Sequence, residues 1–304
     1  MKRLLLLLAS LLLFLHPAGA QDYVSTADDI ALGKLVLGRL AAASQQDPGS
    51  QMILAAKALL DQPYEAGTQE GREERLRIYL TRTDCILFAE TCLGLVRTVQ
   101  RCGPLASFED LARALQQTRY RDGVVDGYAS RLHYTTEWIR QGEKNGFFRD
   151  MTEELGGVQD TRPINYMSSH PDSYAPLKGE SGYARENLRQ IRAMEARVNG
   201  MPRWYIPKEK LAEVEDRIQS GDILCLATSI DGLDYSHVVI AYREKPGAPL
   251  GFIHASTSAK KVIVEPRSLQ AYLQANKRAS GISVLRVADP ADNLSEKSVS
   301  LSSL

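Results

Sequence analysis

The hydrophobic periodicity of the chain changes once, and this change limits the possible folds more than any other feature. Up to about residue 117, apolar residues recur at helical spacing. From residue 222 onward they form short β-branched runs separated by Gly, Asp and Pro. Helices followed by strands are typical of an α+β fold, whereas an α/β fold alternates the two. We therefore predict N-terminal helices packed on an antiparallel sheet that is formed by the last third of the chain.

The helical part contains four amphipathic stretches separated by Gly and Pro. We predict two helices between about residues 26 and 61 with a break near Pro48-Gly49, and two more at 85–99 and 108–117. A loop with one short strand at 76–80 should precede the third helix. The predicted strands of the last third cover residues 222–227, 237–242, 251–255, 261–264 and 282–287.

The segment 120–183 is dense in aromatic and polar residues, and its regular structure is hard to predict. A long irregular insertion of this kind commonly shapes a binding cleft. Aromatic residues that simply pack in the core are an equally good interpretation. The polar, serine-rich residues 290–304 show little periodicity and predict a flexible tail.

The first twenty residues predict a cleaved signal peptide. Lys2 and Arg3 form a basic start, Leu4–Leu15 an apolar run, and Ala18-Gly19-Ala20 a cleavage site of small residues. The run is shorter than the roughly 18–20 apolar residues of a membrane span. We therefore expect an exported protein, in the bacterial periplasm or outside the cell, that is not stably inserted in a membrane after cleavage.

The charge balance excludes several classes of partner. The chain has 37 basic and 37 acidic residues, and loss of Lys2 and Arg3 with the signal peptide leaves 35 basic residues, a net charge of −2. Neither a basic patch for nucleic acid nor a basic amphipathic helix for a membrane surface is apparent. A small or neutral substrate is the expected partner, and the sequence leaves the oligomeric state open.

The four cysteines match no zinc-binding pattern, since the chain has neither CxxC nor HExxH. No metal and no cofactor is therefore predicted. If Cys85 is kept free for catalysis, three cysteines remain and cannot all pair. Cys92 and Cys102 could form a disulfide, whereas Cys225 in its apolar strand has the character of a small buried hydrophobic residue. The pairing stays open.

Cys85 is the strongest candidate for a chemical role. It follows Thr83-Asp84, whose short polar side chains favour a helix cap, so it should lie in the first helical turn. There the free amides and the helix dipole favour a thiolate, and an amide beside the sulfur can stabilise an oxyanion. A cysteine at a helix start is common by chance, so a nearby base is needed to support catalysis.

Two histidines at strand ends could supply that base. His237 begins an apolar strand 152 positions after Cys85, and His254 ends the next strand. Neighbouring antiparallel strands can bring the two rings together, so that His254 fixes the tautomer of His237 and leaves its other nitrogen facing Cys85. Each histidine alone could be an ordinary strand-end residue. His133 and His170 are weaker candidates, more consistent with packing or surface positions.

Several motifs together resemble the NlpC/P60 superfamily of cell-wall cysteine hydrolases. They are Thr83-Asp84-Cys85, Gly221-Asp222-Ile223-Leu224, His237-Val238-Val239-Ile240 and Ile253-His254-Ala255-Ser256. More narrowly, the chain looks like the branch catalogued as domain of unknown function 1460, which is N-acetylmuramoyl-L-alanine amidase-like. The motifs that carry this second resemblance are Pro63-Tyr64-Glu65-Ala66-Gly67-Thr68, Arg131-Leu132-His133-Tyr134, Asn165-Tyr166-Met167-Ser168 and Gly232-Leu233-Asp234-Tyr235-Ser236-His237.

The resemblance implies a papain-like α+β core whose catalytic residues are Cys85, His237 and His254. It implies a muropeptide substrate, cut between N-acetylmuramic acid, in its ordinary or its anhydro form, and L-alanine. Tyr64 and Asp84 match positions that border the substrate cleft in related enzymes. The chain departs from the family after the nucleophile, where Ile86-Leu87-Phe88 replaces small hydroxyl residues, which bears on fine specificity.

The expected organisation is a signal peptide at 1–20, one catalytic domain at 21–289 and the tail at 290–304. Within the domain, a helical part at 21–62 precedes the core at 63–289, which carries the insertion at about 120–183. Two other functions stay open: a γ-D-glutamyl-diamino acid endopeptidase of the same superfamily, and a non-catalytic peptidoglycan-binding protein.

Overall fold

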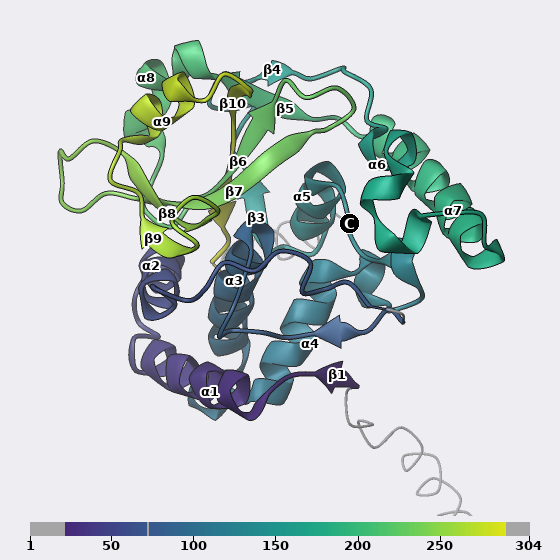
Figure 1. Cartoon of the computed structure of the whole chain (residues 1–304). Coiled ribbons are helices and arrows are strands. Elements are labelled where there is room, and N and C mark those ends of the chain that lie inside the picture. Colours follow the sequence, from purple (N-terminus) through teal and green to yellow (C-terminus); the bar gives the residue numbers. More distant parts are fainter. Residues whose placement is uncertain (1–21, 72, 290–304) are drawn as a thin grey trace, which may run out of the picture.

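The fold is a helical layer packed on an antiparallel sheet, as the periodicity predicts (Figure 1). It is seen in a computed structural model that describes residues 22–71 and 73–289. The predicted signal peptide at 1–20 and the predicted tail at 290–304 lie outside the described residues. No helix within the described ranges is long and apolar enough to cross a membrane.

The described residues form helices and strands with the following bounds. The helices are α1 (Ala27–Ala42), α2 (Pro48–Ala58), α3 (Cys85–Cys102), α4 (Phe108–Arg119), α5 (Thr135–Lys144), α6 (Tyr166–Ser169), α7 (Gly182–Asn199), α8 (Leu211–Val214) and α9 (Leu269–Ala275). The strands are β1 (Tyr23–Val24), β2 (Leu76–Arg77), β3 (Phe148–Asp150), β4 (Val158–Gln159), β5 (Trp204–Pro207), β6 (Ile223–Thr228), β7 (Tyr235–Tyr242), β8 (Gly251–Ser256), β9 (Lys261–Val264) and β10 (Ala279–Val287).

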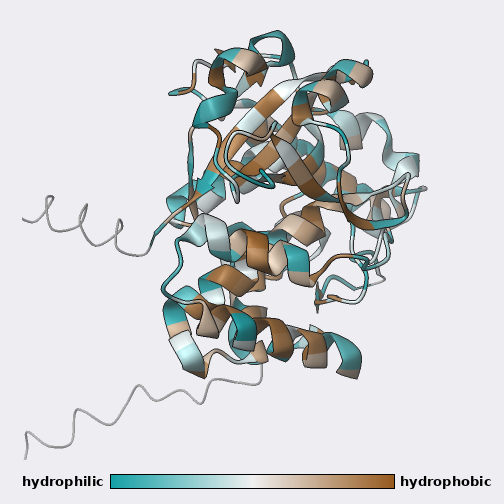
Figure 2. Ribbon diagram, turned by 90° about the vertical axis from the view of Figure 1, so that its left-hand side faces the viewer, coloured by the Kyte–Doolittle hydropathy of each residue, from teal (hydrophilic) through white to brown (hydrophobic). Residues whose placement is uncertain are grey.

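The main sheet has the order β4-β5-β10-β6-β7-β8-β9, and β3 also pairs with β10. All of its strand pairs are antiparallel. Strand β6 is fully buried because both faces of the sheet are covered. Its successive residues Cys225 and Leu226 belong to two different hydrophobic clusters, one on each face. Figure 2 shows this as brown, hydrophobic strands between the helical layers.

Helix α3 is the central element of the larger cluster. It contacts α1, α2 and α4 as well as strands β7 and β8, and residues 87–96 are buried without interruption. A helix that is buried all round needs apolar residues on every face, which explains the dense run from Leu87 to Val99. On the other face of the sheet, α8 and α9 cover the second cluster.

Several predicted boundaries are confirmed within a few residues. Helix α3 begins at Cys85 and continues three residues past the predicted end. Ser107 caps α4 through a capping box with Asp110, whose side chain accepts from the Ser107 amide. The break predicted near Pro48-Gly49 is confirmed: α1 ends at Ala42, and Pro48 is the first residue of α2, where a missing N–H costs nothing.

The predicted insertion at about 120–183 contributes strands to the main sheet. Its strand β3 pairs with β10, and β4 pairs with β5, so this part of the chain extends the main sheet. The remainder packs in a third hydrophobic cluster with α6 and α7 (Figure 1). Most of its large aromatic residues are buried there or in the main core: Tyr128, Tyr134, Trp138, Phe147 and Phe148. These support the packing interpretation over that of a cleft lining.

Candidate active site

Cys85 lies in the first turn of α3, as the sequence predicts. Asp84 is the N-cap, and its Oδ1 accepts a hydrogen bond of 2.9 Å from the Leu87 amide. The chain just before it is held by backbone hydrogen bonds: the Thr83 amide donates to the Pro63 carbonyl at 3.0 Å, and the Glu65 amide to the Thr83 carbonyl at 2.8 Å. The half-buried thiol therefore has a fixed position at the N-terminus of α3.

Strand β7, which carries His237, packs against the helix that begins at this thiol. The backbone amide of Val238, the residue after His237, is among the groups that act to lower the pKa of the Cys85 thiol, so it lies near the sulfur. The nucleophile candidate and the first histidine candidate, 152 positions apart in sequence, thus lie on neighbouring elements.

The expected lowering of the thiol pKa is wrong. Burial of the sulfur, followed by the charge of Asp84, raises the pKa of Cys85 to about 12, although amides of Val238, Ile86 and Cys85 itself act in the opposite direction. Desolvation penalises the thiolate more than the helix start stabilises it. In the resting protein Cys85 is a neutral thiol.

His237 and His254 are hydrogen-bonded to each other. His237 Nε2 and His254 Nδ1 lie 2.7 Å apart, and the two rings meet edge to face at 77°. Strands β7 and β8 pair only through residues 240–242 and 251–253, so beyond these pairs the side chains, not the backbones, connect them. Burial, and then the neighbouring His254, lower the pKa of His237 to about 3, so its ring is neutral.

Sequence reasoning missed a carboxylate behind His254. The Oε2 atom of Glu265 lies 3.3 Å from His254 Nε2, and both side chains are buried. Glu265 Oε1 accepts a hydrogen bond of 2.6 Å from Arg267 Nε, and the Arg267 guanidinium lies over the Tyr272 ring. Glu265 directly follows β9 in a Glu-Pro-Arg turn, and an acidic residue in a turn gives no sign of burial in the sequence.

Tyr64 and Asp84 do lie beside the thiol. Burial, followed by the charges of Cys85 and Asp84, raises the pKa of Tyr64 to about 12. Burial also raises the pKa of Asp84, while Arg119 and Arg131 act in the opposite direction. The two candidate cleft residues, both half-buried, therefore lie near Cys85.

The other two histidines have local structural partners. His133 Nε2 donates to the Tyr128 carbonyl at 2.8 Å, and the two rings are in contact. His170 is exposed and stacks on Tyr166. These placements agree with the packing and surface roles predicted for them.

All four cysteines lie in the described ranges and are free thiols, so the structure contains no Cys92–Cys102 disulfide. Among the described residues, no group of three or more His, Cys, Asp or Glu side chains is arranged to hold a metal ion.

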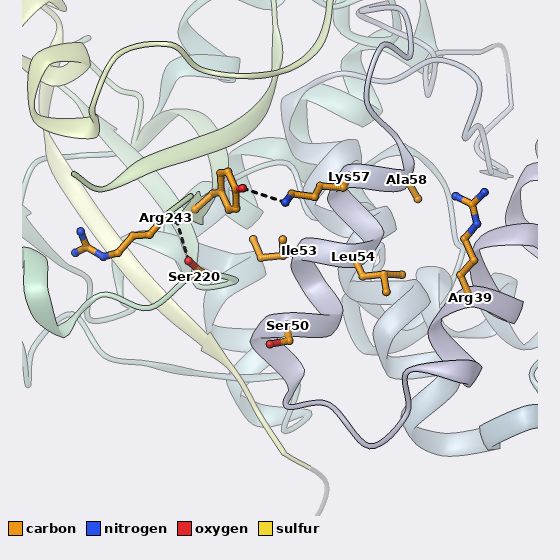
Figure 3. Close-up of a pocket in the computed structure, with 9 residues that line it drawn as sticks. Arg39, Ser50, Ile53, Leu54, Lys57, Ala58, Ser220 and Arg243 are labelled. Atoms are coloured by element: carbon orange, nitrogen blue, oxygen red, sulfur yellow. Dashed lines mark hydrogen bonds between the residues drawn. The ribbon is translucent and has the colours of Figure 1, made fainter. Parts of the chain in front are cut away.

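An open pocket of about 530 Å³ lies elsewhere, between α2 and the far end of β7 (Figure 3). Arg39 and Arg243 stand at its opposite ends, and Lys57 Nζ donates to the Tyr242 hydroxyl at 2.9 Å. Tyr242 is five residues from His237, about 17 Å along the strand. None of the candidate catalytic residues lines this pocket.

Solved structures share the fold. An N-acetylmuramoyl-L-alanine amidase from Bacteroides uniformis ATCC 8492 is 37% identical, with a TM-score of 0.72, and the match covers 79% of this chain and 98% of that one. A candidate xylanase from Bacteroides fragilis is also 37% identical, with a TM-score of 0.71 and coverage of 77% and 99%. A Legionella pneumophila protein of the DUF1460 family is 18% identical, with a TM-score of 0.62 and coverage of 86% and 97%, and shows the fold alone. No curated protein matches.

This α+β fold is that of the amidase-like proteins. Residues 54–282 match the AmiA-like family, described as N-acetylmuramoyl-L-alanine amidase-like. The match includes Cys85, His237, His254 and Glu265 and spans most of the chain. The protein belongs to this family.

Proposed function

We propose that the protein is an NlpC/P60-type cysteine amidase that hydrolyses the bond between N-acetylmuramic acid and L-alanine in muropeptides. The observation that supports the proposal is the packing of α3, which begins at Cys85, against β7, which carries His237 of a hydrogen-bonded pair of histidines. The family match and the amidase from Bacteroides uniformis support the class of substrate. The predicted signal peptide supports action outside the cytoplasm.

The mechanism starts from a neutral thiol and a neutral imidazole, as the directions of their pKa shifts indicate. As the sulfur attacks the lactyl carbonyl carbon, the thiol proton moves to Nδ1 of His237, the nitrogen that His254 leaves free. The amide of Cys85, in the first helical turn, has no acceptor within the helix and can donate to the developing oxyanion.

The tetrahedral intermediate then collapses. The imidazolium of His237 gives its proton to the alanine nitrogen as the C–N bond breaks, which leaves a thioester on Cys85 and releases the peptide. His237 next takes a proton from water, which attacks the thioester carbon. His237 returns this proton to the sulfur as the C–S bond breaks, which regenerates the thiol. The muramic carboxylic acid loses its own proton to the solvent and leaves as the carboxylate.

Two variants test the nucleophile. Cys85→Ala should abolish turnover of a defined muropeptide, whereas Cys102→Ser, at a half-buried cysteine far along the same helix, should leave it unchanged. Iodoacetamide should inactivate the wild type with alkylation at Cys85. Full turnover by the Cys85→Ala protein would end the cysteine-hydrolase proposal.

Product analysis tests the bond. Release of the free muramic sugar and an intact peptide supports the amidase. Release of an L-Ala-D-Glu fragment still attached to the sugar would instead assign the γ-D-glutamyl-diamino acid endopeptidase. Tight binding of the muropeptide without any product, from a folded wild-type protein, would assign the non-catalytic binding function.

A further inference from the structure

Glu265 is buried at one end of a chain of side-chain contacts that leads through His254 to His237. Its amide donates to the Phe252 carbonyl at 2.9 Å, which fixes it beside β8. One carboxylate oxygen accepts from Arg267 Nε at 2.6 Å, and the other faces His254 Nε2 at 3.3 Å. The chain of contacts continues through the 2.7 Å bond between His254 and His237.

The carboxylate decides which nitrogen of His254 carries hydrogen. The 3.3 Å contact is longer than a well-aligned hydrogen bond, yet Nε2 finds no other partner among the described side chains and backbone groups. An unprotonated Nε2 would turn its lone pair toward a negative oxygen, which is repulsive, whereas an N–H there is attracted. His254 therefore carries its hydrogen on Nε2, and its Nδ1 is an acceptor.

The position of the hydrogen on His254 also determines the position of the hydrogen on His237. Because His254 Nδ1 is an acceptor, the 2.7 Å bond requires the hydrogen to sit on His237 Nε2. A neutral imidazole carries only one hydrogen, so His237 Nδ1 is a bare acceptor. That is the state required to take the proton of a neutral thiol.

We propose that Glu265 is a positioning residue that fixes the direction of hydrogen bonds through His254 and His237, and so keeps His237 Nδ1 ready to accept the Cys85 proton. The proposal rests on the proposed cysteine mechanism and names a fourth residue for it. Glu265 touches neither the substrate nor the sulfur. It acts through the two rings.

The groups around His254 leave Glu265 as the carboxylate that sets this direction. His254 is faced by His237 from β7, Phe252 from its own strand, Tyr272 from α9 and Glu265. Burial raises the pKa of Glu265, but hydrogen bonds from Arg267 outweigh it and the net shift is downward, so the residue is an anion that can only accept. For His254, burial lowers the pKa while Glu265 opposes that change.

Arg267 makes an unusually specific test possible. In Glu265→Gln the side chain has one oxygen and one NH₂ group, and Arg267 can only donate, so the oxygen should turn to Arg267. The NH₂ group then faces His254 Nε2 and requires a lone pair there. The hydrogens of both rings move to Nδ1, and His237 presents an N–H to the thiol instead of an acceptor.

The expected result for Glu265→Gln is a fall of kcat by about 10²–10⁴ with little change in KM, since a wrong tautomer in a serine-protease triad lowers kcat by about 10⁴. The second variant is Glu265→Gln combined with Arg267→Met. Without Arg267 the glutamine oxygen is free to face His254, so kcat should recover at least tenfold over Glu265→Gln alone. A residue with only a structural role would give a double variant no more active than the single one.

Nitrogen-15 NMR of the imidazoles in the whole purified protein gives a readout that needs no turnover. Wild type should show His237 and His254 with hydrogen on Nε2, Glu265→Gln should show both on Nδ1, and the double variant should return to Nε2. Assignment uses His237→Gln and His254→Gln, and urea unfolding confirms that each variant is folded.

The outcomes separate the two proposals. Wild-type kcat in Glu265→Gln, or unchanged tautomers in it, would overturn the role of Glu265 even if Cys85→Ala is inactive. Activity retained by Cys85→Ala would overturn the proposed function, and the NMR result would still report on the hydrogen-bond direction. Loss of kcat with the tautomer change, together with recovery in the double variant, supports the proposal.

Discussion

The buried pair of Glu90 and Arg119 allows a quantitative prediction about the support of the nucleophile helix. Glu90 lies on α3 and Arg119 on α4, and Arg119 Nε donates to Glu90 Oε2 at 2.8 Å with both side chains 4% exposed. Arg119 Nη1 also donates to Gln69 Oε1 at 2.8 Å and to the Arg77 carbonyl. One arginine therefore connects α3, α4 and the loop that leads to Cys85.

The two partners should differ in how much they contribute. Burial raises the pKa of Glu90 despite the attraction of Arg119, so the site does not favour the carboxylate charge strongly. Glu90→Gln keeps an acceptor oxygen for Arg119 and should cost about 1–2 kcal/mol. Arg119→Met leaves a buried carboxylate and two further acceptors unpaired, and should cost about 3–5 kcal/mol.

Urea unfolding at pH 7, with linear extrapolation, measures the loss of unfolding free energy in each variant. Thermal unfolding measures the change in Tm. For a domain of this size we expect Arg119→Met to lower Tm by about 6–20 °C and Glu90→Gln by about 2–8 °C. The control is the exposed pair Glu186–Arg189 on α7, 2.7 Å apart, where Arg189→Met should leave stability nearly unchanged because solvent screens the pair. A Glu90→Gln variant less stable than Arg119→Met would refute the reasoning.

Two further predictions concern local features. Burial, and then the charge of Arg131, lower the pKa of His133 to about 3; its contribution to the free energy of unfolding is therefore complete above the unfolded pKa near 6.5 and declines by about 1.4 kcal/mol per pH unit between pH 6.5 and 3. Urea unfolding from pH 7 to 4 should show a slope smaller by that amount in His133→Gln, and an unchanged slope would contradict the assignment. Gly232 has φ +76° and a Cβ there would lie 2.3 Å from Asn165 Oδ1, whereas Gly247 has φ +77° and open space. Gly232→Ala should therefore lower stability by about 2–4 kcal/mol and Gly247→Ala by about 1 kcal/mol, and equal thermal shifts would show that the contact with Asn165 is unimportant.

The fold was predictable where the chain carries a long periodic signal. The start of α3 at Cys85 and the strands β6 to β10 follow from apolar spacing and β-branched runs. The sequence also predicted that His237 and His254 meet, because adjacent antiparallel strands place them side by side. In both cases, local periodicity and short connections determine the outcome.

The rest depends on contacts between distant segments. Strands β3 and β4 are two or three residues long, too short for any periodicity, and exist because β10 and β5 pair with them. Glu265 is buried because the Phe252 carbonyl holds its amide. The thiol pKa was predicted in the wrong direction because a helix start is visible in sequence, while desolvation by the surrounding fold is not.

The first strand matters to anyone who prepares this protein. Strand β1 pairs in parallel with β2, the Ile78 amide donates to the Val24 carbonyl at 2.8 Å, and the Tyr23 ring contacts Phe108. Strand β2 ends only eight positions before Cys85. A recombinant chain trimmed to begin at Thr26 would keep every helix. It would remove the strand that pairs with β2, and with it a support of the segment that leads to Cys85. The choice of first residue in an expression plasmid is therefore also a choice about the state of the active site.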